Sequence, residues 1–395
     1  MDSAGGRAVT SISPTPSSEG SKRVRIVYDH QIFWRQRYGG VSRYFFEIAE
    51  RLSTCPETQV TVLAPLYVNE YLASARRDLV QGVKYDPWAP LFRFRGMANE
   101  ALSWAWMRRH RSIDVVHETY FSPRRLAPRR AKVVVSVYDM IHELRPGDFP
   151  PDDPSAQRKA AAIRRADHVI CISHNTRNDL LTLVNVDPGK VSVVHLGSSL
   201  RNGASADRVA PTDGRPYLLY VGDRNGYKNF SGLLAAVAES TVLRRETRII
   251  AFGGGPITEE ERAAMRELKL PQELVTQLEG SDAVLRTCYL GALALVYPSL
   301  YEGFGIPVLE AMSLDCPVIC ANASSLPEVA GDAAELFDVH DPGSLAVAIE
   351  RVVLSEARRD ELKARGRARS TMFSWDRCAA ETHAVYRRVL GDEPQ

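Results

Sequence analysis

The pattern of the stretch "ALALVYPSLYEGFGIPVLEAM" (292–312) predicts a strand, a glycine turn and the start of a helix. Its first part, residues 292–299, is an apolar run of the kind found in strands that are covered on both faces. Gly303 and Gly305 then interrupt the pattern, and Pro307 suits the first position of a helix, where a missing N–H costs nothing. Such a strand–turn–helix unit is the building block of parallel α/β sheets.

The same unit recurs along the whole chain. Short apolar runs followed by helical patterns occur at 24–29, 59–65, 114–118, 131–139, 166–173 and 190–197, and again at 216–222, 247–255, 273–280, 292–299, 316–322 and 333–338. A polar segment separates the two series. We therefore predict an α/β fold with two Rossmann-like, doubly wound parallel-sheet domains that face a central cleft, where the strand ends of both domains can meet a ligand.

The 395 residues exceed the length that one hydrophobic core normally spans, which agrees with two domains. Residues 1–22 are rich in Ser, Gly and Pro and contain no apolar run, so we predict a disordered tail rather than a signal peptide. The first domain is expected at 23–198, the linker at 199–215 and the second domain at 216–375. Residues 376–395 are expected to form a C-terminal helix that returns to the first domain.

The distribution of charge and the cysteines indicate the kind of partner and the compartment of the protein. The net charge is only +2, but residues 1–205 hold 29 Lys and Arg against 20 Asp and Glu, a local balance of +9. This excess suggests anionic partners such as phosphate or an acidic membrane surface. Nucleic acid is not expected, because the basic residues form no stripe interleaved with aromatics. Six cysteines without a CxxC pair indicate reduced thiols and a cytoplasmic protein.

The turn at the start of the quoted helix has the features of a phosphate site. The backbone N–H groups of Phe304, Gly305 and Ile306 are expected to point out of the helix start, where the helix dipole favours an anion. Gly303 and Gly305 let the backbone approach a ligand without an intervening Cβ. The helix N-terminus therefore predicts contact with phosphate groups.

Two glutamates stand eight positions apart in this stretch. Glu310 can accept two hydrogen bonds from a vicinal diol such as ribose, and Glu302 lies in the loop, where a sugar on the other side of the phosphates would be. The alternative is an ordinary strand–turn–helix connection whose glutamates have no ligand.

Two cations follow the first strand of the second domain, in "YVGDRNGYKNF" (220–230). Arg224 and Lys228 can neutralise a diphosphate, Arg224 by its fork and Lys228 as a point charge. Alternatively, both are solvated surface cations. The chain has no DxD pair and no His/carboxylate cluster with metal-ligand spacing, so we expect no metal and no other cofactor.

With these residues the chain resembles the retaining glycosyltransferases of family four, mannosyltransferases among them, which have the GT-B architecture of two Rossmann-like domains. The motif "EGFGIPVLE" (302–310) matches the family's E-x7-E element, and the segment from "PVICANASSLPEVAG" (317–331) onward follows in the expected order. The resemblance covers residues 23 to about 390. It implies a nucleotide-sugar donor as co-substrate, with Glu310 on the ribose, Glu302 on a sugar hydroxyl, and Arg224 and Lys228 on the diphosphate.

The resemblance also implies further donor-binding residues. Gly39 and Gly40 would lie near the β-phosphate, and Gly253, Gly254 and Leu285 near the base. At the far end of the donor sugar, Tyr138 stands where the family usually has histidine, followed by Asp139. His142, three residues later, is either the missing imidazole or a structural histidine.

The first domain offers candidates for the acceptor site. His117 and Glu118 end the strand at 114–118 and are expected to face the cleft. Ser173 ends the strand at 166–173 and is a further candidate, with Asn175 close by; capping of the next helix is the alternative.

The implied reaction is the transfer of a hexose, mannose as the best guess, with retention at the anomeric carbon. The donor would be GDP-mannose or a UDP-hexose, and the acceptor a saccharide or polyprenyl-linked saccharide of a surface polysaccharide such as lipopolysaccharide. A nucleotide-sugar 2-epimerase would need no acceptor, and a non-catalytic nucleotide-sugar-binding protein would bind donor without transfer. A dinucleotide dehydrogenase is disfavoured, because no G-x-G-x-x-G opens a helix after the first strand.

A segment at 86–111 raises the question of membrane contact. It combines aromatic side chains (Trp88, Phe92, Phe94, Trp104, Trp106) with arginines (Arg93, Arg95, Arg108, Arg109, Arg111). This composition suits either a surface that meets anionic lipid on the inner face of a membrane or a helix packed on the core with its arginines in water. No apolar run is long enough to span a membrane.

Overall fold

The computed structural model describes residues 23–85, 94–110, 112–200 and 214–392. The predicted tail at 1–22 and most of the predicted linker at 199–215 lie outside the described residues. The same holds for Trp88, Phe92, Arg93 and Arg111 of the aromatic and arginine-rich segment.

The first domain contains a parallel sheet of seven strands in the order β3-β2-β1-β4-β5-β6-β7. Its strands are β1 (Val24–Tyr28), β2 (Thr58–Tyr67), β3 (Val80–Lys84), β4 (Val115–Glu118), β5 (Lys132–Val137), β6 (His168–Cys171) and β7 (Val191–Val193). Its helices are α1 (Gly40–Thr54), α2 (Glu70–Ser74), α3 (Arg95–Arg109), α4 (Ile141–Leu144), α5 (Ser155–Arg165) and α6 (His174–Leu183), with short 3-10 turns η2 (Pro146–Asp148) and η3 (Pro188–Lys190). The strand order reverses direction between β1 and β4, as in doubly wound folds.

The second domain repeats this plan with six parallel strands in the order β10-β9-β8-β11-β12-β13. Its strands are β8 (Tyr217–Val221), β9 (Arg248–Phe252), β10 (Val275–Leu278), β11 (Ala294–Tyr297), β12 (Val318–Ala321) and β13 (Glu335–Phe337). Its helices are α7 (Phe230–Glu239), α8 (Thr241–Glu246), α9 (Glu259–Glu267), α10 (Asp282–Gly291), α11 (Ile306–Ser313), α12 (Leu326–Ala330), α13 (Ser344–Val353) and α14 (Glu356–Ser370), with 3-10 turns η4 (Gly226–Lys228) and η5 (Gln272–Leu274). The predicted fold class is therefore confirmed.

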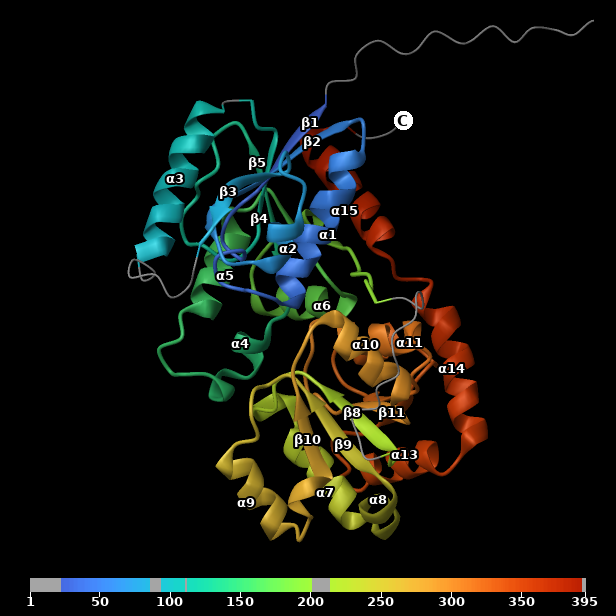
Figure 1. The fold of residues 1–395 in the computed structure, drawn as a ribbon. Coiled ribbons are helices and arrows are strands. Elements are labelled where there is room, and N and C mark those ends of the chain that lie inside the picture. The colour runs from blue at the N-terminus through green and yellow to red at the C-terminus, as the bar shows by residue number, and fades with distance from the viewer. Residues whose placement is uncertain (1–22, 86–93, 111, 201–213, 393–395) are drawn as a thin grey trace, which may run out of the picture.

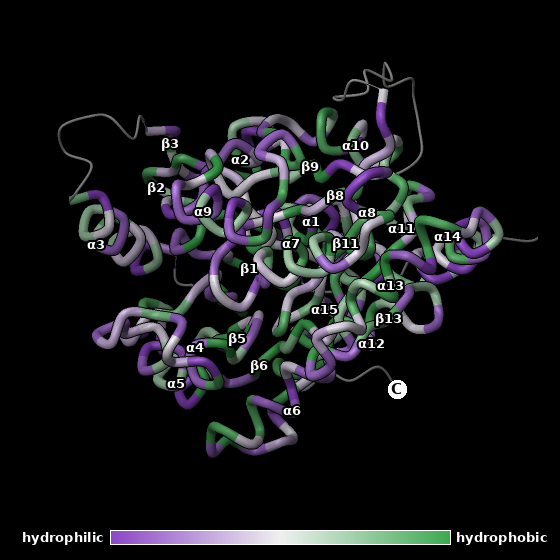
Figure 2. Tube along the Cα trace, turned by 90° about the horizontal axis from the view of Figure 1, so that it is seen from below, coloured by the Kyte–Doolittle hydropathy of each residue, from purple (hydrophilic) through white to green (hydrophobic). Residues whose placement is uncertain are grey.

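The strands are buried on both faces, as their unbroken apolar runs predict. Val133, Val134 and Val135, three consecutive residues of β5, have no exposed surface. Consecutive residues of a strand point to opposite faces, so helices must cover both sides of the sheet. Figure 2 shows hydrophobic colour along β5 and β6 and hydrophilic colour on many of the outer loops.

The last helix, α15 (Trp375–Leu390), leaves the second domain and lies against α1 and β5 of the first domain (Figure 1). The hydroxyl of Tyr386 on α15 lies 3.0 Å from the hydroxyl of Tyr28 and 2.6 Å from Nδ1 of His117. The chain therefore crosses between the domains twice, which restricts how they can move. Among the described residues, no helix is both long and apolar enough to cross a membrane.

Candidate active site

A cavity of about 620 Å³ lies between the two domains. The first domain lines it with the start of α1 and the loop after β5, and the second domain with the loops after β8, β9 and β11 and with the start of α11. These are carboxyl ends of parallel strands, where ligands of doubly wound folds bind. A cavity of about 640 Å³ near Arg23, Arg25 and Ser112 lies at the opposite edge of the first sheet, so we do not assign it a role in the reaction.

The quoted motif forms the floor of the cavity. Gly305 precedes α11 with φ 105°, a left-handed conformation that favours glycine, and a proline follows in the first turn of the helix. The Ser325 hydroxyl donates to the carbonyls of Glu302 (2.8 Å) and Phe304 (3.0 Å), and Ser324 Oγ accepts from the Glu302 N–H at 2.8 Å. The loop is thus held in one shape by two serines.

Two glycines let the domains touch at this point. A Cβ at Gly303 would lie 1.6 Å from the carbonyl oxygen of Tyr138 in the first domain, and a Cβ at Gly40 would lie 3.2 Å from Cδ1 of Ile306 in the second. Both positions predicted to contact the donor therefore also lie where the two domains touch.

Lys228 and Glu302 meet on one side of the cavity. Lys228 Nζ lies 2.7 Å from Glu302 Oε1, and both side chains are largely buried and line the cavity. Burial lowers the pKa of Lys228, but the Glu302 carboxylate together with Tyr227 and Asp223 outweighs this effect and holds that pKa above its usual value. Lys228 is therefore charged, and it sits beside the loop where a diphosphate and a sugar are expected.

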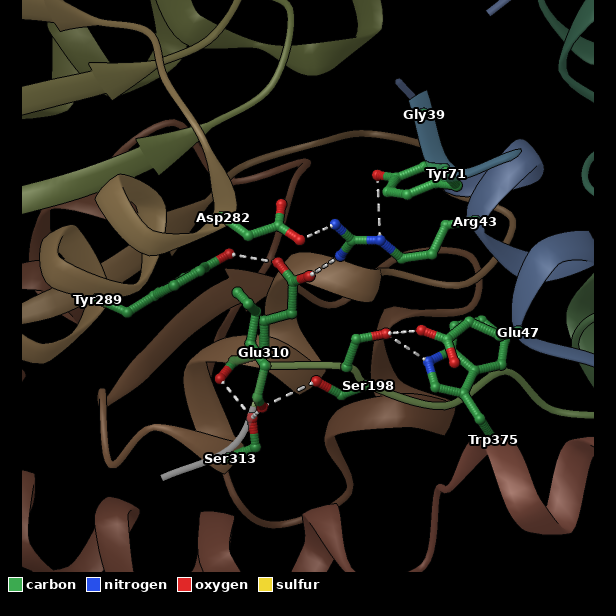
Figure 3. Close-up of polar contacts among 12 residues, drawn as sticks. Gly39, Arg43, Glu47, Tyr71, Ser198, Asp282, Tyr289, Glu310, Ser313 and Trp375 are labelled. Carbon is green, nitrogen blue, oxygen red and sulfur yellow. Dashed lines mark hydrogen bonds and ion pairs between the residues drawn. The ribbon is translucent and has the colours of Figure 1, made fainter. Parts of the chain in front are cut away.

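Glu310 lies on the other side, one turn into α11 (Figure 3). Its side chain is almost completely buried; Oε2 accepts from the Tyr289 hydroxyl at 3.1 Å and Oε1 accepts from Arg43 Nη1 at 3.3 Å. Burial raises the pKa of Glu310 to about 7, an effect that Arg43 and the Tyr289 hydrogen bond oppose. Both carboxylate oxygens are thus engaged.

Arg43 is a residue that the sequence analysis did not single out. It stands on α1, three residues after Gly40, and its guanidinium reaches across the cleft to Glu310 and Asp282 of the second domain (Figure 3). Nε also donates to the Tyr71 hydroxyl at 3.2 Å. The sequence did offer a signal for Arg43, because it lies one turn after the glycine pair at which the helix starts. Side chains of a helix point back toward its N-terminus, so the Arg43 side chain is expected to point toward the predicted phosphate site.

Asp139 lines the cavity as predicted, and a second unpredicted cation holds it. Lys159 on α5 is buried and donates to the Asp139 carbonyl at 2.9 Å, to Asp139 Oδ1 at 3.3 Å and to Glu143 Oε2 at 2.9 Å. The Tyr138 hydroxyl instead donates to the Thr119 carbonyl at 2.8 Å, inside the first domain. Tyr138 therefore contributes backbone rather than its hydroxyl to the cavity.

Arg224, which was predicted to bind the diphosphate by its fork, is absent from the described cavity lining. Its side chain is 2% exposed and binds Glu261 at 2.6 Å and the carbonyls of Gly253, Gly255 and Pro256 at 2.9 Å each. The carbonyls of Gly253, Gly255 and Pro256 belong to the glycine-rich loop after β9. Arg224 therefore holds that loop in place by hydrogen bonds. The loop does line the cavity through Gly253 and Gly254, which have φ of 88° and 70°, and Leu285 lines it from α10.

His117 and Glu118 do not face the cleft, contrary to prediction. His117 has no exposed surface; its Nδ1 contacts Tyr386 and its Nε2 lies 2.9 Å from Ser136 Oγ, and burial lowers its pKa to about 3. Glu118 pairs with Arg165 at 2.6 Å, and burial raises its pKa to about 8. Both side chains turn into the interior of the first domain because β4 is covered on both faces.

Ser173 and His142 also lie away from the cavity. Ser173 is the N-cap of α6, and its hydroxyl accepts from the Thr176 N–H at 3.0 Å. The structure therefore shows helix capping, the alternative to an acceptor-binding role for this residue. The His142 ring stacks on Phe149 with centroids 4.1 Å apart and is absent from the described cavity lining. It does not replace the histidine expected near Asp139 in this conformation.

The domains also meet at Glu328. Its carboxylate accepts from the backbone N–H groups of His174 (2.8 Å) and Asn175 (3.1 Å) at the start of α6, and it pairs with His195 Nε2 at 2.6 Å. Ligand atoms of His174, His195 and Glu328 lie within 4.8 Å of one another, a spacing the sequence did not reveal because these residues are distant along the chain. None of the three lines the cavity.

Comparisons with known proteins point to one family. The model for glycosyl transferases group 1 matches residues 204–369, and the model for glycosyltransferase family 4 matches residues 38–201. The chain is 26% identical to O-antigen chain mannosyltransferase B of Escherichia coli, over 88% of this chain and 96% of that protein. Among solved structures, it is similar to sucrose-phosphate synthase from Thermosynechococcus elongatus (TM-score 0.74, 19% identity, 94% of this chain and 100% of that one). It is also similar to Anabaena HepE in complex with UDP and glucose (TM-score 0.69, 15% identity, 92% and 98%). At these identities the structural matches support the GT-B fold.

Proposed function

The chain belongs to the family 4 glycosyltransferases, and from this premise we propose that it transfers a hexose, with mannose as first choice, from a nucleotide sugar to a saccharide acceptor with retention. The observation that carries the proposal is that Lys228, Glu302 and Glu310 line one cavity between two Rossmann-like domains, beside the glycine turn that opens α11. The E. coli relative is named a mannosyltransferase of an O-antigen chain, which supports mannose and a surface-polysaccharide acceptor.

In this proposal the donor spans the cavity from Glu310 to Glu302. The ribose binds Glu310, the diphosphate lies by the turn at Phe304 and Gly305 and by Lys228, and the hexose reaches Glu302 and Asp139. Anions are stabilised at helix N-termini, and a Lys Nζ adds a point charge. The base lies against the loop of Gly253 and Gly254, whose lack of side chains leaves room for a ring.

The chemistry that fits this arrangement is attack on the face that the leaving group vacates. The acceptor hydroxyl oxygen bonds to the anomeric carbon as the bond from that carbon to the phosphate oxygen breaks, and the hydroxyl proton moves to that phosphate oxygen. The products are the glycoside and the nucleoside diphosphate. Lys228 and the helix start stabilise the negative charge that grows on the leaving group, so we propose that no metal ion is needed.

We also propose that the acceptor is lipid-linked and that the enzyme works on the cytoplasmic face of a membrane. Support comes from α3 and its N-cap residue Phe94. Phe94 and Trp104 are about half exposed, at 51% and 49%, while Asn99, Ser103 and Met107 face the protein. The Arg108 guanidinium lies 4.7 Å from the centre of the Trp104 ring. Exposed aromatics beside arginines suit an anionic interface. Salt-sensitive co-sedimentation with anionic liposomes tests this part.

The main test is a thermal-shift panel of GDP- and UDP-sugars, followed by a transfer assay on lipid-linked saccharides. A ligand at a hundred times its dissociation constant stabilises the folded state by about 2.7 kcal/mol. The proposal predicts a shift for one nucleotide class and a glycoside product with retained configuration. Conversion of the donor to its 2-epimer without acceptor, or binding without any transfer, contradicts it.

A further inference from the structure

The charges around the cavity are out of balance for an anionic donor. Among the described residues that line it, the carboxylates are Asp139, Asp223, Asp282, Glu302 and Glu310, whereas the cations are Lys228 and Arg43. A nucleoside diphosphate adds two or more negative charges to this space. Because an unpaired buried charge is costly, we expect the cations of the cavity to pair with the negative charges of the diphosphate.

Arg224 does not fill this need, because Glu261 and three carbonyls use its donors. Lys228 is one countercharge, on the Glu302 side. Arg43 remains, and its side chain is only 9% exposed and forms ion pairs with both Glu310 and Asp282. The guanidinium is thus held within the cavity and within reach of the carboxylate that we assign to the ribose.

Arg43 also occupies the position that the ribose requires. Glu310 Oε1 accepts from Arg43 and Oε2 from Tyr289, so a ribose diol that binds Glu310 competes with the guanidinium. Arg43 lies three residues after the start of α1, or about 4.5 Å along the helix axis. The displaced side chain can therefore turn toward the helix start at Gly39 and Gly40, where the β-phosphate is expected.

We propose that Arg43 is the second cation that binds the donor diphosphate, and that it exchanges Glu310 for the diphosphate when the ribose enters. The inference rests on the proposed function, because it takes the cavity to be the nucleotide-sugar site. Arginine suits this exchange, since its planar fork binds carboxylate and phosphate with the same geometry. The Tyr71 ring, 5.2 Å from the guanidinium carbon, supports the side chain while it is paired with Glu310.

The test compares a nucleoside diphosphate with its nucleoside, using GDP and guanosine or UDP and uridine, whichever base the full-length wild type binds. Calorimetry, with competition for the weak nucleoside, gives both affinities. In Arg43→Met the diphosphate affinity should fall about 10- to 100-fold, whereas the nucleoside affinity should stay or rise, because Glu310 is freed. Arg51→Met, on the same helix but outside the described cavity lining, is the matched control and should bind both normally.

Asp282→Asn gives an independent test of opposite sign. It removes one competitor for Arg43, so diphosphate affinity should rise in the wild-type background and rise less when Arg43→Met is also present. A folded Arg43→Met that keeps its diphosphate affinity, or loses diphosphate and nucleoside affinity equally, overturns the assignment of Arg43 alone. A wild type that binds neither GDP nor UDP overturns the proposed function itself.

Discussion

Replacement of Gly303 by alanine tests whether the two domains must touch for catalysis. A Cβ there would lie 1.6 Å from the Tyr138 carbonyl oxygen and 3.3 Å from Cβ of Asp139. Real Cβ contacts are essentially never shorter than 3.0 Å, so the two loops must separate by about 1.4 Å. The backbone at Gly303 is not left-handed, and alanine therefore strains nothing within the second domain.

The size of this displacement sets the expected effect. A misplacement of about 1 Å can cost about 100-fold in rate, so kcat/KM for transfer should fall by about two orders of magnitude. A free nucleoside, whose binding does not depend on Arg43 of the first domain, should bind nearly as before, because Glu310 and the loop of Gly253 and Gly254 belong to the second domain. The melting temperature should change little, since each domain keeps its own core. Steady-state kinetics, calorimetry and a thermal scan on one preparation separate these effects.

Gly147→Ala is the matched control. A Cβ at Gly147 meets nothing within 4 Å, and its backbone is not left-handed, so this variant should behave as wild type. If folded Gly303→Ala transfers sugar at the wild-type rate, the contact between Gly303 and Tyr138 is not part of the reacting state and the reasoning fails.

Three further predictions concern the same cavity. Glu310→Ala should weaken GDP or UDP binding by about 1.5 to 3 kcal/mol, whereas Glu302→Ala should mainly lower turnover; calorimetry beside rate measurements distinguishes them. Transfer should persist in excess EDTA, and a complete loss that Mg²⁺ or Mn²⁺ restores would contradict the metal-free mechanism. Burial raises the pKa of Glu310 from 4.5 to about 7, so its carboxyl binds a proton more tightly in the folded state. The free energy of unfolding should thus fall by up to about 3 kcal/mol as pH rises through 4.5 to 7, and Glu310→Gln should lack this component in denaturant titrations.

The fold was predictable because strands buried on both faces leave an unmistakable apolar run. Every strand of the second sheet falls within or overlaps a run identified in the sequence. In the first sheet, β3 (Val80–Lys84) was missed, because this edge strand is largely exposed and reads "VQGVK". An edge strand is covered less completely, and its sequence therefore carries a weaker pattern.

The site was predictable where one segment supplies both the backbone and the side chain. Glu302, Gly303 and Glu310 lie in one strand–turn–helix unit, so their relative placement follows from local structure. The direction of Arg224 did not follow, because the carbonyls that hold it belong to another loop. Arg43 and Lys159 were missed for the same reason: their partners lie 239 to 267 and 16 to 20 residues away along the chain.

The contacts between the domains differ in whether the donor can replace them. If Glu310 binds the ribose as proposed, the Arg43 link to Glu310 competes with the donor, whereas the Glu328 contact with the start of α6 and with His195 lies outside the described cavity lining. Because polar interdomain contacts of this kind permit relative motion, the domains need not stay fixed when the first link breaks. The Glu328 contact can then persist while the donor diphosphate replaces Glu310 as the negatively charged partner of Arg43. On the proposal that Arg43 exchanges Glu310 for the diphosphate, the donor does not enter an open cleft; its diphosphate replaces one existing link between the domains.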